Sequence, residues 1–260
     1  MNILDQLAEY ARYRVSESKK ILSCQDLKDR ADGLPKGNFE FENALKKPGL
    51  SFICECKKAS PSKGIIAEDF PYLDIARDYE AAGADAISVL TEPKWFLGKD
   101  EYLREITEVV NIPCIRKDFT VDPYMIYEAK CLGASAVLLI CSILSVDEIS
   151  NYISICDSLG MSALVEAHDQ KEVDMAISAK ARIIGVNNRN LKDFSVDTNN
   201  SARLREMIPE DILFVSESGV RNREDVASLE KIGADALLIG ETLMRSHDKK
   251  LMLNSLKGIC

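Results

Sequence analysis

The sequence of 260 residues has few side chains that could form a metal site. It has only two histidines, His168 and His247, and none of its eight cysteines belongs to a Cys-x-x-Cys pair. Zinc sites need Cys and His ligands at short spacings, so we expect no metal. Most of the cysteines lie in apolar runs, where a thiol packs as a small hydrophobic group. Free thiols indicate a reducing compartment, and we therefore expect a cytoplasmic protein.

We expect neither a leader nor a membrane span, and the sequence has no excess of positive charge. Residues 1–14 carry alternating charges instead of the apolar core of a signal peptide. No run approaches the roughly 18 apolar residues that cross a bilayer. Lysine and arginine (33) are outnumbered by aspartate and glutamate (42), which gives a formal net charge of −9. An acidic chain binds nucleic acid and anionic membranes poorly, so we expect neither as a partner.

Eight short apolar runs recur from residue 50 onward, at intervals of roughly 25 residues. Their hydrophobicity is continuous, which is typical of strands covered on both faces in a parallel sheet. The intervening segments carry helix signals, among them Asp122-Pro123 at a helix start and capping-box spacing at Ser145–Glu148 and Asp169–Glu172. Glycines suited to helix ends precede three of the runs, at Gly83, Gly133 and Gly233. The runs are 51–55, 86–90, 112–116, 136–140, 162–166, 182–186, 212–216 and 236–240.

Eight strand–helix units predict an α/β fold of the (β/α)8 TIM barrel class. A doubly wound open sheet is the alternative, although such sheets usually have fewer strands. We expect a single domain over 1–260, with an N-terminal helical extension in 1–49 and the barrel in 50–260. The extension begins with an amphipathic helix over 3–22 and has a short helix near 41–46. The first helix could cover the bottom of the barrel, and the sequence leaves open which end it covers.

Polar side chains gather at the carboxyl ends of the predicted strands, where TIM barrels place their active sites. Glu55 and Lys57 leave the first strand side by side, because residues i and i+2 share a face. Alone, this pair could equally be an ion pair on an edge strand, and strand ends can be polar simply because they meet solvent. The full set at these ends is Glu55, Lys57, Glu92, Lys117, Asp118, Ser142, Glu166, Asn187, Arg189, Glu217, Ser218, Gly240 and Glu241.

Strand parity selects the members of this set that would converge on one site. Two carboxylates among three cations can split their pKa values into acid and base roles. Arg116, Asp118 and Asn188 have the opposite parity, and we expect them to support neighbouring helices. The predicted inward-facing residues are Glu55, Lys57, Lys117, Glu166, Asn187 and Arg189.

Small residues follow the last two predicted strands, at Ser218-Gly219 and Gly240. Glycine lets backbone N–H groups approach a ligand, and residues 241–245 could form a short helix behind them. This arrangement is typical of a barrel phosphate site, with an ordinary turn as the alternative.

Two loops could cover the predicted site. The loop 58–69 is long for a strand–helix connection and could form a lid, or could be only a long surface loop. Trp95 and Phe96 follow the second strand and could cover an aromatic substrate, with packing on a helix as the alternative. We interpret His168 as a loop residue and not as a base.

Six motifs in one order resemble those of the indole-3-glycerol phosphate synthase family. They are FICECKKASPSKG, RKDF, LVEAHD, GVNNRNL, SESG and LIGETLM. The resemblance covers essentially the whole chain and implies a TIM barrel without metal or organic cofactor. It implies conversion of 1-(2-carboxyphenylamino)-1-deoxyribulose 5-phosphate into indole-3-glycerol phosphate, CO₂ and water. The partner would thus be a phosphorylated, anthranilate-derived small molecule. We expect a monomer, and another enzyme of the pathway could dock on it.

The resemblance implies catalytic roles residue by residue. Lys117 resembles the general acid that protonates the substrate carbonyl, and we expect a lowered pKa for this buried lysine. Glu166 resembles the second acid/base, which stabilises a cationic intermediate and assists dehydration. Glu55 and Lys57 resemble a pair that orients the substrate and assists proton transfer. Asn187 resembles a group that orients the substrate hydroxyls.

The resemblance also implies how the substrate is bound. Ser60 and Arg189 suit the anthranilate carboxylate, and Phe119 would pack on its ring. Glu241 stands where many family members have a serine beside the phosphate. We expect its side chain to point outward and its backbone N–H to bind. The other phosphate contacts would be Ser218, Gly219 and Gly240.

Two other functions are weighed against the synthase. A phosphoribosylanthranilate isomerase-like sugar isomerase would need a strand-1 cysteine and a later aspartate. Here Cys54 and Cys56 face away from Glu55, and the sixth strand ends in Asn187. A non-catalytic binding barrel would need phosphate contacts but no acid/base pair, so the presence of Lys117, Glu166 and Glu55 together argues against it.

Overall fold

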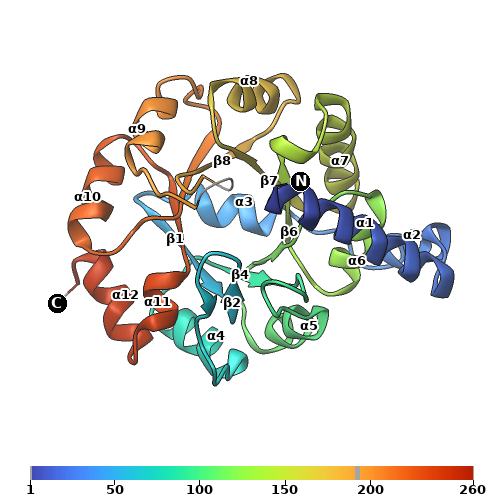
Figure 1. Ribbon diagram of the computed structural model, residues 1–260, viewed down its shortest axis with the longest axis horizontal. Coiled ribbons are helices and arrows are strands. Elements are labelled where there is room, and N and C mark those ends of the chain that lie inside the picture. The colour runs from blue at the N-terminus through green and yellow to red at the C-terminus, as the bar shows by residue number, and fades with distance from the viewer. Residues whose placement is uncertain (1, 191–193, 260) are drawn as a thin grey trace.

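The computed structural model describes residues 2–190 and 194–259, which contain a closed barrel of eight parallel strands (Figure 1). Leu191, the last residue of the motif GVNNRNL, and Cys260 lie outside the described residues. Each strand pairs with the next along the chain, and the last pairs with the first, so the predicted TIM barrel is confirmed. The strands are β1 (Ser51–Cys56), β4 (Ala86–Leu90), β5 (Cys114–Lys117), β6 (Ala136–Ile140), β7 (Ser162–Ala167), β8 (Ile183–Asn187), β9 (Leu213–Glu217) and β10 (Ala236–Ile239).

Helices surround the barrel, as Figure 1 shows, and the predicted helix signals lie at their ends. Asp122 caps α6 ahead of Pro123, and Ser145 forms a capping box with Glu148. The surrounding helices are α4 (Tyr72–Ala81), α5 (Asp100–Val109), α6 (Pro123–Cys131), α7 (Val146–Leu159), α8 (Gln170–Ser178), α9 (Asn199–Arg205), α10 (Arg223–Lys231), α11 (Glu241–Arg245) and α12 (Lys249–Lys257). A 3₁₀ turn, η1 (Cys141–Ile143), follows β6. Gly83, Gly133 and Gly233 have φ of 79°, 86° and 78°, as helix-ending glycines do.

Three helices precede the barrel: α1 (Ile3–Ile21), α2 (Cys24–Asp32) and α3 (Glu40–Leu45). The short helix α3 covers the bottom of the barrel. The Glu42 backbone N–H donates to Ser162 Oγ at the start of β7, and Ser51 Oγ at the start of β1 donates to the Ala44 carbonyl. Polar groups at the strand starts therefore bind this helix.

The first helix lies at the opposite end, across the barrel mouth, which we define as the carboxyl ends of the strands and the loops after them. The Arg14 guanidinium contacts the Asp118 carboxylate at 2.6 and 3.1 Å. Ile3 and Leu7 line the same cavity as Glu55. The idea that α1 covers the bottom is therefore wrong, because its cation pairs with a buried carboxylate that follows β5.

Arg116 and Asn188, whose strand parity points them away from the barrel interior, contact helices, as expected from the sequence. Arg116 is 1% exposed and forms ion pairs with Asp100 of α5 and Glu128 of α6. The Asn188 carboxamide oxygen accepts the backbone N–H of Ser201 in α9. Among the described residues, no helix is long and apolar enough to cross a membrane.

The Arg14–Asp118 pair gives the first prediction. The Asp118 side chain is fully buried, so Arg14→Ala leaves a buried carboxylate with less compensating charge. We expect a loss of about 3 kcal/mol in the free energy of unfolding, the scale for breaking one side of a buried pair. Urea unfolding measures this loss.

Arg77→Ala is the matched control, because Arg77 pairs only on the helix surface with the exposed Asp74. Its unfolding midpoint should stay close to that of the parent protein. Equal midpoints for the two variants would contradict the assignment of α1 to the mouth.

Candidate active site

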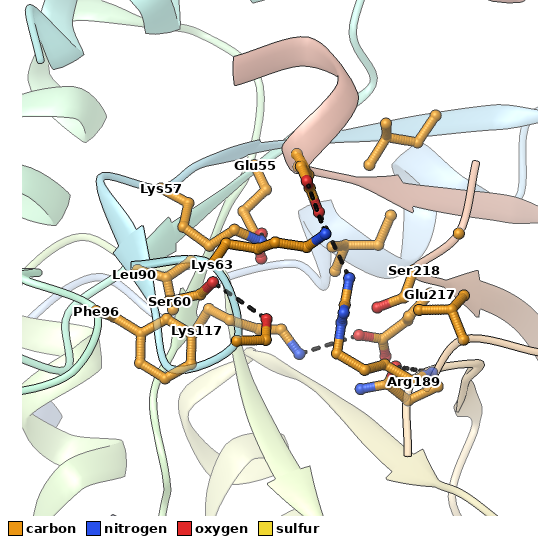
Figure 2. A pocket seen from close by; sticks show the side chains of 18 of the residues that line it. Glu55, Lys57, Ser60, Lys63, Leu90, Phe96, Lys117, Arg189, Glu217 and Ser218 are labelled. Atoms are coloured by element: carbon orange, nitrogen blue, oxygen red, sulfur yellow. Dashed lines mark hydrogen bonds and ion pairs between the residues drawn. The ribbon is translucent and has the colours of Figure 1, made fainter. Parts of the chain in front are cut away.

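A cavity of about 640 Å³ opens at the barrel mouth (Figure 2). Its walls come from strand ends around the barrel, from the loop after β1 and from the first two turns of α1. It brings together all twelve residues that the motifs single out, namely Glu55, Lys57, Ser60, Lys117, Phe119, Glu166, Asn187, Arg189, Ser218, Gly219, Gly240 and Glu241. These residues line the same cavity, and the roles assigned to them stay predictions.

The centre of the cavity is a buried ammonium shared by two carboxylates. Lys117 Nζ, at the end of β5, lies 2.8 Å from Glu166 Oε2 and 3.0 Å from Glu217 Oε2. The three side chains are 12%, 3% and 2% exposed. Two of the three ammonium hydrogens therefore have carboxylate acceptors, which leaves one to point at a ligand.

The pKa expected for Lys117 from the sequence is wrong in direction. Burial by itself favours the neutral amine, but the negative charges of Glu166 and Glu217 outweigh it and raise the pKa of Lys117. The sequence argument assumed that cations would dominate the surroundings. In the structure the nearest charged groups are carboxylates, so the lysine stays charged.

The two carboxylates differ in protonation. Burial acts to raise the pKa of Glu166, but Lys117 and His168 overcome this effect and lower it to about 2. The pKa of Glu217 is raised to about 7. Burial is the main cause, the charge of Glu166 raises the pKa further, and the charge of Lys117 partly opposes both effects. One carboxyl thus stays ionised while its neighbour holds a proton close to neutral pH. Such a split is typical of acid and base partners in active sites.

Glu217 is the functional candidate to which the motif resemblance assigns no role. It stands in the motif SESG, and in the parallel register it lies opposite Asn187. Its Oε1 is buried, and a Cβ added at Gly185 would come within 2.2 Å of that atom. Glu217 is among the polar strand ends but receives no role from the sequence, and the register of β8 and β9 adds the signal that it stands beside Asn187 at the site.

Glu55 and Lys57 form an ion pair at the end of β1, where the two side chains lie side by side (Figure 2). Both face the cavity, as their parity predicted. A Cβ added at Gly240 would lie 2.2 Å from Glu55 Oε1 and 2.8 Å from Lys57 Nζ. Glycine at this position therefore makes room for the pair. Cys54 and Cys56 are buried and do not line the cavity.

The side chain of Glu241 does not point outward, so that expectation is wrong. Its carboxylate lies 3.5 Å from Lys63 Nζ, 3.6 Å from Arg189 Nη2 and 3.1 Å from Arg245 Nε. Lys63 and Arg189 belong to loops of the mouth, and their charges draw the carboxylate across the rim. Burial alone would raise the pKa of Glu241, but Arg245 and Lys63 lower it.

Asn187 links the triad of Lys117, Glu166 and Glu217 to Arg189 at the rim of the cavity. Its amide Nδ2 donates to Glu166 Oε1 at 3.2 Å, and its Oδ1 accepts the backbone N–H of Arg189 at 3.0 Å. The carboxamide is therefore fixed at both ends, with its side chain on the cavity wall.

The long loop after β1 folds over the mouth and contains a small hairpin, β2 (Ala59–Ser60) and β3 (Gly64–Ile65). Ser60 lines the cavity, with its Oγ 3.4 Å from Ser62 Oγ. Phe96 and Phe119 face the cavity together, with ring centroids 6.1 Å apart. Trp95 instead packs edge-on against Tyr10 of α1. One of the two predicted aromatic residues thus reaches the site.

Strand β9 ends in left-handed backbone. Ser218 has φ of 68° and Gly219 has φ of 94°, and both line the cavity. A non-glycine residue in this region is uncommon and often marks a functional position.

By contrast, Glu92 and Ser142 do not line the cavity. Glu92 accepts three backbone N–H groups of the following loop, and Ser142 donates to Glu172. Within residues 2–190 and 194–259, no cluster of Cys, His, Asp and Glu could hold a metal ion.

The raised pKa of Glu217 generates a prediction about stability. An unfolded glutamate titrates near pH 4.5, whereas folded Glu217 keeps its proton up to about pH 7. Between these values the folded state binds more protons, so this carboxyl lowers the stability as the pH rises. Glu217→Gln removes the titration. We expect the variant to gain about 2 kcal/mol relative to the parent between about pH 5 and about pH 8, measured by urea unfolding.

Glu210→Gln serves as the control, because Glu210 is an exposed glutamate outside the cavity. The difference between this variant and the parent should not change with pH. A difference between parent and Glu217→Gln that is also constant with pH would contradict the proton held by Glu217.

Comparison with known proteins identifies the family. The family model described as indole-3-glycerol phosphate synthase matches residues 4–256. The indole-3-glycerol phosphate synthase of Ruminiclostridium cellulolyticum is 58% identical over 257 residues, covering 98% of this chain and 99% of that protein. The one from Lacticaseibacillus paracasei is 51% identical over 256 residues and covers 98% of both chains.

Solved structures with low sequence identity share the fold. A 3-hexulose-6-phosphate synthase superposes with a TM-score of 0.66 at 14% identity, over 81% of this chain and 99% of that one. This likeness supports the barrel alone. The match of the family model, the full-length relatives and the six motifs around one cavity agree, and the chain belongs to the indole-3-glycerol phosphate synthase family.

Proposed function

We propose that the cavity at the barrel mouth is where the chain carries out its family's activity, indole-3-glycerol phosphate synthesis in tryptophan biosynthesis. The substrate is the phosphorylated, anthranilate-derived 1-(2-carboxyphenylamino)-1-deoxyribulose 5-phosphate, which loses CO₂ and water as the ring closes. One observation carries the proposal: inside the cavity, Lys117 Nζ lies 2.8 Å from Glu166 and 3.0 Å from Glu217.

Ring closure needs an acid at the substrate carbonyl. As the aromatic carbon attacks, negative charge develops on the carbonyl oxygen, and a nearby ammonium stabilises it and supplies the proton. Lys117 has a hydrogen free for this contact, because Glu166 and Glu217 accept the other two. Glu217 holds a proton near neutral pH and can restore the one that Lys117 gives up.

Loss of CO₂ and water passes through a cationic intermediate. An ionised carboxylate in a water-poor cavity stabilises such a cation electrostatically and then accepts a proton from it. Glu166 suits both tasks, since it stays ionised beside Lys117. Glu55 and Lys57 stand across the cavity as a second charged pair that orients the substrate. Asn187 would hold its hydroxyls. These steps need no metal or organic cofactor.

Binding would use two sets of residues, which meet where Arg189 contacts Glu241. Arg189 and Ser60 would hold the anthranilate carboxylate, with Phe119 and Phe96 against the ring. The phosphate end would be the backbone at Ser218, Gly219 and Gly240, with the N–H of Glu241. Its carboxylate keeps its charge near the phosphate, where Lys63 and Arg245 neutralise it. Binding energy at the phosphate then fixes the reacting carbons in position.

We infer one domain over residues 1–260, active as a monomer in the cytoplasm. A partner enzyme of the pathway could dock near the mouth, where the product leaves.

The assay is indole fluorescence after the carboxyphenylamino-deoxyribulose phosphate is added to the purified protein. We expect turnover by the parent, and we expect Lys117→Met to lower kcat by at least about 10³-fold, the scale for losing a general acid. Lys171→Met, an exposed lysine of α8, is the control and should turn over normally. No signal from folded parent protein would overturn the function, and a near-normal Lys117→Met would overturn the assignment of the acid.

Ser218 tests the phosphate end. Ser218→Asp adds a negative charge there, and aspartate tolerates the left-handed backbone of this residue. We expect KM to rise at least about tenfold with a smaller change in kcat, because like charges repel across the binding contact. Ser218→Asn has nearly the same shape without the charge and should keep most of the affinity. Equal KM values for the two variants would remove the phosphate from this position.

A further inference from the structure

His168 lies between two carboxylates, directly behind Glu166. Its Nε2 is 3.4 Å from Glu166 Oε1, and its Nδ1 is 3.1 Å from Glu172 Oε2. The imidazole is largely buried, with a side-chain exposure of 17%. It does not line the cavity, so it can act on the reaction only through its neighbours.

The backbone and the second carboxylate hold the ring in place. Glu172, in α8, accepts the backbone N–H of His168 at 2.8 Å and a hydrogen bond from Ser142 in η1. The spacing Asp169–Glu172 predicted a full capping box, but Asp169 only accepts the Glu172 N–H, and the Glu172 side chain turns to His168 instead. From α9, Asn200 donates to the His168 carbonyl at 3.1 Å. The imidazole therefore has little freedom to turn away from Glu166.

The protonation of the ring follows from its two neighbours. A neutral imidazole has one N–H, so one nitrogen lone pair would face a carboxylate oxygen. Nε2 is buried, and within the described part of the chain it has no hydrogen-bond partner of good geometry. A protonated imidazole donates from Nδ1 to Glu172 and places its positive charge 3.4 Å from Glu166 Oε1, which removes this repulsion. The geometry thus favours the imidazolium.

The surrounding charges act in the same direction. The groups that face the ring are Glu166 from β7, Glu172 from α8 and Glu217 from β9, while Lys117 from β5 pairs with Glu166 on the far side. Ser142 from η1 and Asn200 from α9 are neutral, and Asn200 accepts a hydrogen bond from the charged Arg203 of α9. Burial acts to lower the pKa of His168, but the hydrogen bond to Glu172 and the charge of Glu166 raise it.

We propose that protonated His168 is a positioning residue for Glu166, holding its carboxylate ionised and aimed at Lys117 and the cavity. Glu166 then has three partners: Lys117 on Oε2, and Asn187 and His168 on Oε1. The role rests on the proposed function, in which Glu166 is the acid/base of the reaction. Loss of the imidazolium leaves the carboxylate less firmly oriented and more easily protonated.

The first test is a titration of the imidazole by NMR, which needs no activity. The chain has only two histidines, and His247→Gln assigns their signals. We expect His168 to titrate above 6.5, the ordinary histidine pKa. Glu172→Gln should lower its midpoint by about one unit, because the variant removes a carboxylate partner. A His168 midpoint at or below 6.5, or one unchanged in Glu172→Gln, would overturn the proposal.

The second test is the pH profile of kcat in the synthase assay. The parent should lose activity on the alkaline side with the midpoint that NMR gives for His168, and Glu172→Gln should shift both midpoints together. His168→Gln keeps one N–H donor but no charge. We expect its kcat to fall about tenfold with little change in KM, the scale for losing a charged partner. The part of the alkaline limb that has the His168 midpoint should disappear, while any part set by Glu217 remains.

The outcomes separate this role from the function it rests on. A folded parent without synthase activity would overturn the proposed function and this role with it. An active parent whose alkaline limb persists unchanged in His168→Gln would overturn the role alone. Should His168→Gln fail to fold, Glu172→Gln decides the matter, because a kcat profile that does not follow its NMR midpoint contradicts the proposal. His247→Gln is the control and should match the parent in kcat, KM and pH profile.

Discussion

The site depends on one interaction, the sharing of the Lys117 ammonium by Glu166 and Glu217. Two carboxylates this close cannot both stay ionised without a cation, and a buried cation needs compensating charge. Each member thus stabilises the charge state of the others. One result is a charged lysine with a hydrogen to spare. The other is a pair of carboxylates that differ in protonation at neutral pH.

The barrel supplies what this interaction needs. Closing eight parallel strands brings their carboxyl ends together, so β5, β7 and β9 each deliver one member of the triad to the same point. Small residues leave space for the charged side chains: Gly185 beside Glu217, and Gly240 beside the Glu55–Lys57 pair. Behind the inward-facing layer, Arg116 and its ion pairs tie β5 to two helices. These ion pairs fix β5 against the helices and so help to hold Lys117 in position at the end of that strand.

The fold could be predicted from the sequence because strand spacing and helix-end glycines are local signals. The cavity residues could be predicted too, since strand parity is also local. The position of α1 could not, because it depends on Arg14 meeting Asp118, residues far apart in the chain. The predictions of a lowered pKa for Lys117 and of an outward-pointing Glu241 were wrong for the same reason. Both depend on distances between charges from different strands, which register and loop geometry decide.

The central claim is that two neighbouring carboxylates that share one ammonium differ in protonation, because burial and the charge of Glu166 raise the pKa of Glu217 while Lys117 and His168 lower that of Glu166. Carbon-13 NMR of glutamate side-chain carboxyls measures it directly, with Glu166→Gln and Glu217→Gln to assign the signals. The account predicts that the Glu217 carboxyl titrates near pH 7 while Glu166 stays ionised down to about pH 2. Two carboxyls that both titrate near pH 4.5, the ordinary value for glutamate, would contradict it.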